Sequence, residues 1–98
     1  MLIKQKQDGH KGLFYVEENE KILAEMVYSM TDAGLMIIEH TEVDDELRGK
    51  NVGYQLVNHA VEYARANQLK IFPLCPFTHS VFKKKGAEFA DVLKGKLN

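Results

Sequence analysis

The spacing of apolar residues changes near the middle of this chain, and that change limits the folds available to it. Before Gly53, apolar side chains fall in short alternating or β-branched runs, which are typical of strands. After Gly53, they recur at intervals of three and four residues, which is typical of one face of a helix. We therefore expect a strand-rich first half followed by a helix.

The first half predicts consecutive strands joined by short polar turns. The strand-like runs extend from Gly12 to Glu17, from Lys21 to Met30 and from Leu35 to Val43. Such short connections favour an antiparallel meander. In the second run, alternation predicts one buried face, made of Ile22, Ala24, Met26 and Tyr28.

The second half predicts a helix from Val52 to Asn67 and a short apolar strand from Leu69 to Leu74. The helix has one apolar stripe, formed by Val52, Leu56, Val57, Ala60, Val61 and Ala64. Together with the run from Leu35 to Val43, these elements make a βαβ unit. Its two strands are expected to lie parallel, with a right-handed crossover.

A short C-terminal helix is expected from Pro76 to Gly86, with Thr78 as its N-cap and Gly86 ending it. The segment from Ala87 to Leu93 fits either a closing strand or another helical turn. The predicted fold class is α+β, with a mixed, mostly antiparallel sheet. A chain of 98 residues is expected to form a single domain over residues 1–98.

Composition excludes several classes of function. Thirteen basic and 14 acidic residues give a net charge of −1, so no overall field attracts nucleic acid or an anionic membrane. No apolar run approaches the roughly 20 residues that span a bilayer. A single cysteine and an N-terminus without an apolar signal region favour a cytoplasmic protein. No metal site is expected, because these residues are scattered: His10, His40, His59, His79 and Cys75.

The turn before the helix has the features of a local phosphate site. Gly49 and Gly53 allow a ligand to approach the backbone, and the first N–H groups of the helix point outwards. Arg48 and Lys50 add positive charge beside them. The alternative is a tight loop with two solvated basic side chains. Neither the Walker pattern nor Gly-x-Gly-x-x-Gly is present, so a P-loop or Rossmann nucleotide site is not supported.

This turn, followed by a helix and an apolar strand, resembles the acetyl-CoA motif of the GNAT superfamily of N-acetyltransferases, Arg/Gln-x-x-Gly-x-Gly/Ala. From Phe14 to Val92, the chain is similar to a short, cysteine-containing group in which Cys-Pro-Phe follows the second strand. The resemblance implies a minimal GNAT-like fold that binds acetyl-CoA and transfers acetyl to an unidentified amine. A gap between the two parallel strands would hold the acyl-pantetheine arm.

The resemblance also assigns cofactor-binding residues. The pantetheine arm would pair with Val43, beside Glu42. The pyrophosphate would be bound by Arg48, Gly49, Lys50, Asn51, Val52 and Gly53. Asn51 stands where the family usually has glycine. Asparagine tolerates left-handed backbone angles, so the turn is expected to form, while the Asn51 side chain would crowd the pyrophosphate or bond to it.

Cys75 corresponds to the group's proposed nucleophile, which would take the acetyl group from the thioester. His79, four residues further on, and His40 on the facing strand are the candidate bases. Three alternatives stay open: an inert packed thiol, direct attack by the amine, and a non-catalytic CoA-binding or protein-interaction module. The acceptor side of the site is expected to be open or to be completed by a partner protein. The chain is expected to be a monomer or weak homodimer.

Overall fold

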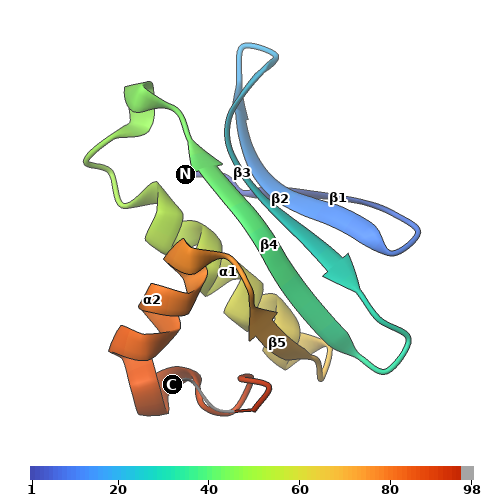
Figure 1. Cartoon of the computed structure of the whole chain (residues 1–98). Helices are drawn as coiled ribbons and strands as arrows, with labels where there is room; N and C mark the ends of the chain where they lie inside the picture. Colours follow the sequence, from blue (N-terminus) through green and yellow to red (C-terminus); the bar gives the residue numbers. More distant parts are fainter. Residues whose placement is uncertain (96–98) are drawn as a thin grey trace.

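The computed structural model describes residues 1–95 and contains one five-stranded sheet with its helices gathered on one side (Figure 1). The strands follow one another across the sheet in chain order. They are β1 (Lys4–Asp8), β2 (Lys11–Glu18), β3 (Lys21–Met30), β4 (Leu35–Val43) and β5 (Lys70–Pro73). The helices are α1 (Val52–Ala66) and α2 (Pro76–Lys85), with short 3-10 helices η1 (Asp45–Leu47) and η2 (Gly86–Phe89). Within residues 1–95, no helix is long and apolar enough to cross a membrane.

Strand pairing confirms the α+β class and the βαβ unit. Strands β1 to β4 are antiparallel neighbours, whereas β4 and β5 run parallel on either side of the crossover helix α1. The sequence reading missed β1, because all of its residues are exposed and none is apolar. Two hydrogen bonds attach this strand to the core: Gln5 donates to the Tyr28 hydroxyl at 2.6 Å, and that hydroxyl donates to Gln7 at 2.9 Å.

The prediction for the buried face of β3 was wrong at Ile22. This side chain is 40% exposed, whereas Leu23 is only 3% exposed and belongs to the core. The register shifts between Val16 and Glu17 on β2, which leaves Leu23 as an extra residue on β3. A bulge of this kind moves all residues before it to the opposite face of the strand. Ala24, Met26 and Tyr28 lie after it and are buried as expected.

The core lies between the sheet and the apolar stripe of α1. All six predicted stripe residues are buried. Phe14, which is fully buried on β2, packs edge-on against the His59 and Tyr63 rings of α1 at 5.1 and 5.6 Å. Full burial of each large apolar side chain stabilises the fold by about 1.5–3 kcal/mol. This packing sets the position of α1, and therefore of the turn that precedes it.

Helix α2 begins earlier than its predicted N-cap. Its N-cap residue is Cys75 and not Thr78, because Pro76 occupies the first turn, where a missing N–H has no cost. Thr78 is instead fully buried. Gly86 ends the helix with a φ of +49°, as expected. The segment from Ala87 to Leu93 contains both a helical turn and a strand-like contact. The helical turn is η2, and an isolated parallel bridge between Leu93 and Ile71 follows it.

We expect Gly12→Ala to destabilise the fold, because a Cβ at this position of β2 would overlap the Tyr28 ring opposite it. Overpacking of this kind costs about 1–3 kcal/mol of unfolding free energy. Urea denaturation measures the loss. In a Tyr28→Leu background the same substitution should cost less, because the ring is gone. An equal cost in both backgrounds would contradict this contact.

Candidate functional site

The site begins where the two parallel strands part. Pairing between β4 and β5 runs from Leu35–Lys70 to Ile38–Pro73 and then stops. The next backbone contact is the Cys75 N–H, which donates to the Ile38 carbonyl at 2.8 Å. Beyond Ile38, β4 continues to Val43 without β5 beside it. This is the gap that the sequence resemblance implied between the two strands.

A groove of about 360 Å³ lies beside the end of β4. It extends from this strand across the turn to the first residues of α1 and α2. Its lining residues are Thr41, Val43, Leu47, Arg48, Gly49, Asn51, Val52, Gly53, Tyr54 and Phe77. Of the predicted cofactor residues, only Glu42 and Lys50 lie outside this lining. Lys50 lines a neighbouring hollow together with Asn51, Tyr54, Gln55 and Asn58.

The backbone of the turn leaves N–H groups beside this groove without acceptors in the helix. Gly49 and Asn51 have φ values of +82° and +57°, and Asn51 adopts the left-handed conformation as the N-cap of α1. The first hydrogen bond of the helix runs from the Gln55 N–H to the Asn51 carbonyl, at 3.0 Å. The N–H groups of the three residues between them therefore have no acceptor inside the helix. They lie at the positive end of the helix dipole, where an anion is stabilised.

The charges around the turn leave the groove suited to an anion. The side chains of Arg48 and Asp45 form an ion pair at 2.7 Å, but they are 80% and 87% exposed. Exposed pairs contribute roughly 0–1 kcal/mol, so the guanidinium is free to turn to a stronger anion. Lys50 is also exposed on the same turn. Both basic groups remain available at the mouth of the groove.

Gly53 is required by close packing at the floor of the groove. A Cβ at this position would lie 2.7 Å from the Phe77 ring, which is closer than real side chains approach. Phe77 is 37% exposed and packs edge-on to Tyr54, with ring centroids 6.0 Å apart. These aromatic side chains form an apolar wall beside the backbone donors. An elongated ligand with an anionic group and a less polar arm fits this combination.

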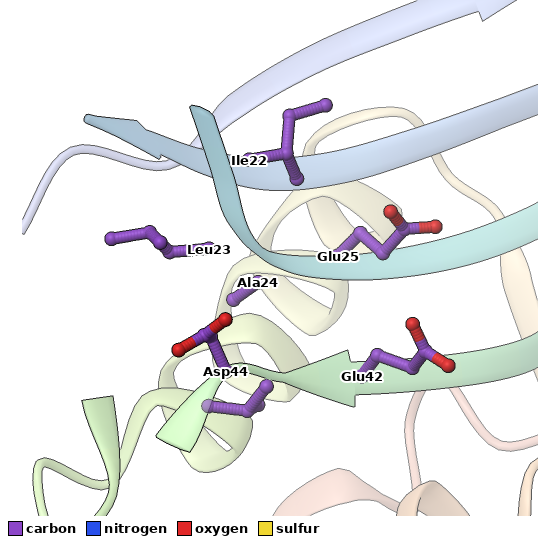
Figure 2. A pocket seen from close by; sticks show the side chains of 7 residues that line it. Ile22, Leu23, Ala24, Glu25, Glu42 and Asp44 are labelled. Carbon is purple, nitrogen blue, oxygen red and sulfur yellow. The ribbon is translucent and has the colours of Figure 1, made fainter. Parts of the chain in front are cut away.

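A second hollow, of about 300 Å³, lies on the other side of Val43 and has the opposite character. Figure 2 shows Glu25 of β3 and Glu42 of β4 beside each other, with Asp44 where β4 ends. Three carboxylates would repel a phosphate group. Glu42 lines this hollow and not the groove. The next residue, Val43, lines both the hollow and the groove.

Cys75 lies just behind the groove. It is 4% exposed, and its Sγ is 3.5 Å from the hydroxyl of Thr41, which lines the groove. Burial raises the pKa of this thiol. The neighbouring polar groups of Thr78, Thr41 and Phe77, which favour the thiolate, outweigh burial, so that the pKa is lowered. A lowered pKa increases the reactive thiolate fraction at neutral pH.

The two candidate bases are placed differently with respect to Cys75. His79 is half-buried on α2, and its backbone N–H donates to the Cys75 carbonyl at 2.9 Å. The His40 ring pairs with Glu42 at 3.2 Å, and strand alternation directs it to the face opposite Thr41. Among residues 1–95, no hydrogen bond joins either imidazole to the sulfur. The backbone of His79 therefore contacts the backbone of Cys75, whereas the His40 side chain lies on the other face of β4.

Comparison with known families finds one whose sequence profile matches most of the chain. Residues 13–92 match the sequence profile described as GCN5-related N-acetyl-transferase. The chain belongs to this family. Among curated protein sequences, none matches it at significance.

Solved structures of the family share the fold. A GCN5-like protein from Staphylococcus aureus is 38% identical, with a TM-score of 0.68 over 95% of this chain and 89% of that one. Glucosamine-6-phosphate N-acetyltransferase from Arabidopsis thaliana is 22% identical, with a TM-score of 0.61 over 90% of this chain and 63% of that enzyme. Aminoglycoside N-acetyltransferase AAC(6')-Iy, solved in complex with CoA, is 12% identical, with a TM-score of 0.56 over 91% of this chain and 71% of that enzyme. The latter two likenesses concern the fold alone.

Several site residues were not identified from the sequence. Thr41 could have been found, because it lies two residues before Val43 and so shares its face of β4. Phe77 and Tyr54 could not, since their contact joins the first turns of two helices that are separate in sequence. Thr78 was identified only as a cap, which the structure contradicts.

The backbone of the turn predicts a clear order of stability for variants at Asn51. Its left-handed conformation suits asparagine and glycine, whereas a β-branched residue is strained there. We expect Asn51→Val to lose about 1–2 kcal/mol of unfolding free energy relative to Asn51→Gly. Urea denaturation measures both. Equal stabilities would mean that the turn does not require a left-handed residue.

Proposed function

We propose that this protein binds acetyl-CoA in the groove beside β4 and transfers its acetyl group to an amine. The family supports acetyl transfer from acetyl-CoA in general. The open N–H groups at the start of α1, with Arg48 and Lys50, suit the pyrophosphate. The stretch of β4 that ends at Val43 has no strand beside it on its β5 side, which suits the amide-bearing pantetheine arm. The close contact between Gly53 and Phe77 leaves no space for a side chain at the floor.

The observation that carries a covalent route is the position of Cys75. Its sulfur contacts Thr41, a lining residue of the groove, and its lowered pKa favours the nucleophilic thiolate. Acetyl-CoA supplies the acetyl group as a thioester. The Cys75 sulfur forms a bond to the acetyl carbonyl carbon while the bond from that carbon to the CoA sulfur breaks, and CoA leaves as a thiolate. The amine nitrogen then bonds to the same carbonyl carbon while the bond from that carbon to the Cys75 sulfur breaks, which regenerates the Cys75 thiolate. His79 is the candidate base that takes the proton from the amine.

We expect acetyl-CoA to raise the thermal unfolding temperature, because a ligand that binds only the folded state stabilises it by mass action. At one hundred times the dissociation constant the gain is about 2.7 kcal/mol. For a domain of this size, that corresponds to a rise of roughly 10 °C or more. No shift at saturating acetyl-CoA would contradict the cofactor assignment.

Gly53→Val is the matched test of the groove. The valine would displace Phe77 and narrow the floor, so the thermal shift with acetyl-CoA should be lost while the protein still unfolds cooperatively. Ala66→Val adds the same side chain at the exposed, far end of α1 and serves as control. It should retain the full shift. A full shift in Gly53→Val would place the cofactor elsewhere.

The covalent route predicts a mass increase of one acetyl group after incubation with acetyl-CoA, located at Cys75 by peptide mapping. The chain has one cysteine, so Cys75→Ala should abolish a thioester adduct. Hydroxylamine at neutral pH should remove the adduct from the native protein, because it cleaves thioesters and leaves acetyl-lysine intact.

Two other results separate the alternatives. Acetylation of amines that persists in Cys75→Ala would favour direct attack on the thioester and exclude Cys75 as an obligatory intermediate. A thermal shift with neither an adduct nor amine acetylation would favour the non-catalytic CoA-binding module.

A further inference from the structure

One buried polar group has no role in the packing described so far. Thr78 lies in the first turn of α2 and is 0% exposed. Among residues 1–95, its hydroxyl oxygen is the buried side-chain nitrogen or oxygen atom that has no hydrogen-bond partner. Leaving a buried hydroxyl unpartnered costs about 1–3 kcal/mol, and valine would fill the same space without that cost. The hydroxyl therefore calls for an explanation other than packing.

Cys75 is the group that this hydroxyl can serve. Its N–H bonds to Ile38 and its carbonyl accepts from His79, so the cysteine backbone is held on both sides. Cys75 is also the N-cap residue of α2, three positions before Thr78, and its side chain makes no capping hydrogen bond with the first turn. On the other side, the Thr41 hydroxyl lies 3.5 Å from the sulfur.

We propose that Thr78 and Thr41 are positioning residues that hold the Cys75 sulfur as a thiolate, each donating a hydroxyl hydrogen to it. The two hydroxyls belong to different elements, Thr78 to α2 and Thr41 to β4. The thiol proton passes to water. A thiol leaves the Thr78 hydroxyl without an acceptor, whereas a thiolate supplies one, so the anion satisfies this buried group. The pKa of the Cys75 thiol is lowered by these same donors, despite burial.

Charged side chains do not account for this environment. The adjoining elements carry these titratable groups: His79, Lys83, Lys84 and Lys85 on α2, Glu39, His40 and Glu42 on β4, Tyr54, His59, Glu62, Tyr63 and Arg65 on α1, and Lys70 on β5. His40 and Glu42 pair with each other on the opposite face of β4. The pKa of the thiol is set by burial and by hydrogen-bond donors, with none of these charges among its causes. Removing a hydroxyl should therefore shift the pKa directly.

The role of this thiolate in acetyl transfer rests on the proposed function, but its test needs no acetyl-CoA. The rate of Cys75 alkylation by iodoacetamide is measured against pH by mass spectrometry, and the midpoint gives the thiol pKa. We expect Thr78→Val to raise that midpoint by roughly one to two pH units, since one hydrogen bond to a charged group is lost. Alkylation at neutral pH should slow by about tenfold or more. Thr78→Ser keeps the hydroxyl and should keep the native midpoint.

Thr41→Val should raise the midpoint as well. The ultraviolet absorbance of the thiolate, taken as the difference from Cys75→Ala, gives an independent midpoint because the chain has one cysteine. An unchanged midpoint in Thr78→Val would overturn the proposal, and so would an equal rise in Thr78→Ser. If the midpoint rises in Thr78→Val but no acetyl adduct forms in the native protein, the proposed function fails and the thiolate site stands. If the adduct forms in the native protein while the midpoint in Thr78→Val stays unchanged, the thiolate site fails and the proposed function stands.

Discussion

The parting of β4 and β5 is the constraint on which the rest of the site depends. The parallel pairing stops at Ile38 and Pro73, and the Cys75 N–H then takes the Ile38 carbonyl as its acceptor. This single bond ends β5, places the cysteine at the fork and begins α2. It also leaves the last part of β4 without a neighbour on that side. A strand pair that continued further would close the groove and bury the cysteine away from any ligand.

The first turn of α2 supplies several parts of the site from adjacent residues. Pro76 begins the helix, Phe77 forms the apolar wall against Gly53, and Thr78 is buried with an unpartnered hydroxyl. A helix turns by roughly 100° per residue, so the adjacent residues Phe77 and Thr78 can face the groove and the core respectively. Small changes in where this helix begins would therefore alter the cofactor groove and the thiol together.

Electrostatics distinguish the two hollows that meet at Val43. The chain has a net charge of only −1, so selectivity has to come from local arrangement. One side offers the N-terminus of α1, Arg48 and Lys50, while the other offers three carboxylates. Long-range steering is weak for such a chain, and the groove differs from the other hollow in its short-range hydrogen-bond donors.

The sequence by itself determined the elements whose residues act locally. The period of apolar residues predicted the stripe of α1, the glycines marked the turn, and the short run after the crossover predicted β5. Tertiary structure decided which face of a strand is buried on either side of a bulge. Ile22 is exposed because β3 accommodates an extra residue opposite β2, and no local pattern reports such a register shift. The neighbour of Cys75 on β4 was likewise invisible in the sequence, because Thr41 meets the sulfur only when a helix and a strand far apart in the chain pack together. Period and turn chemistry depend on neighbouring residues, whereas burial, register and the polarity around a thiol depend on which distant residues share the same space.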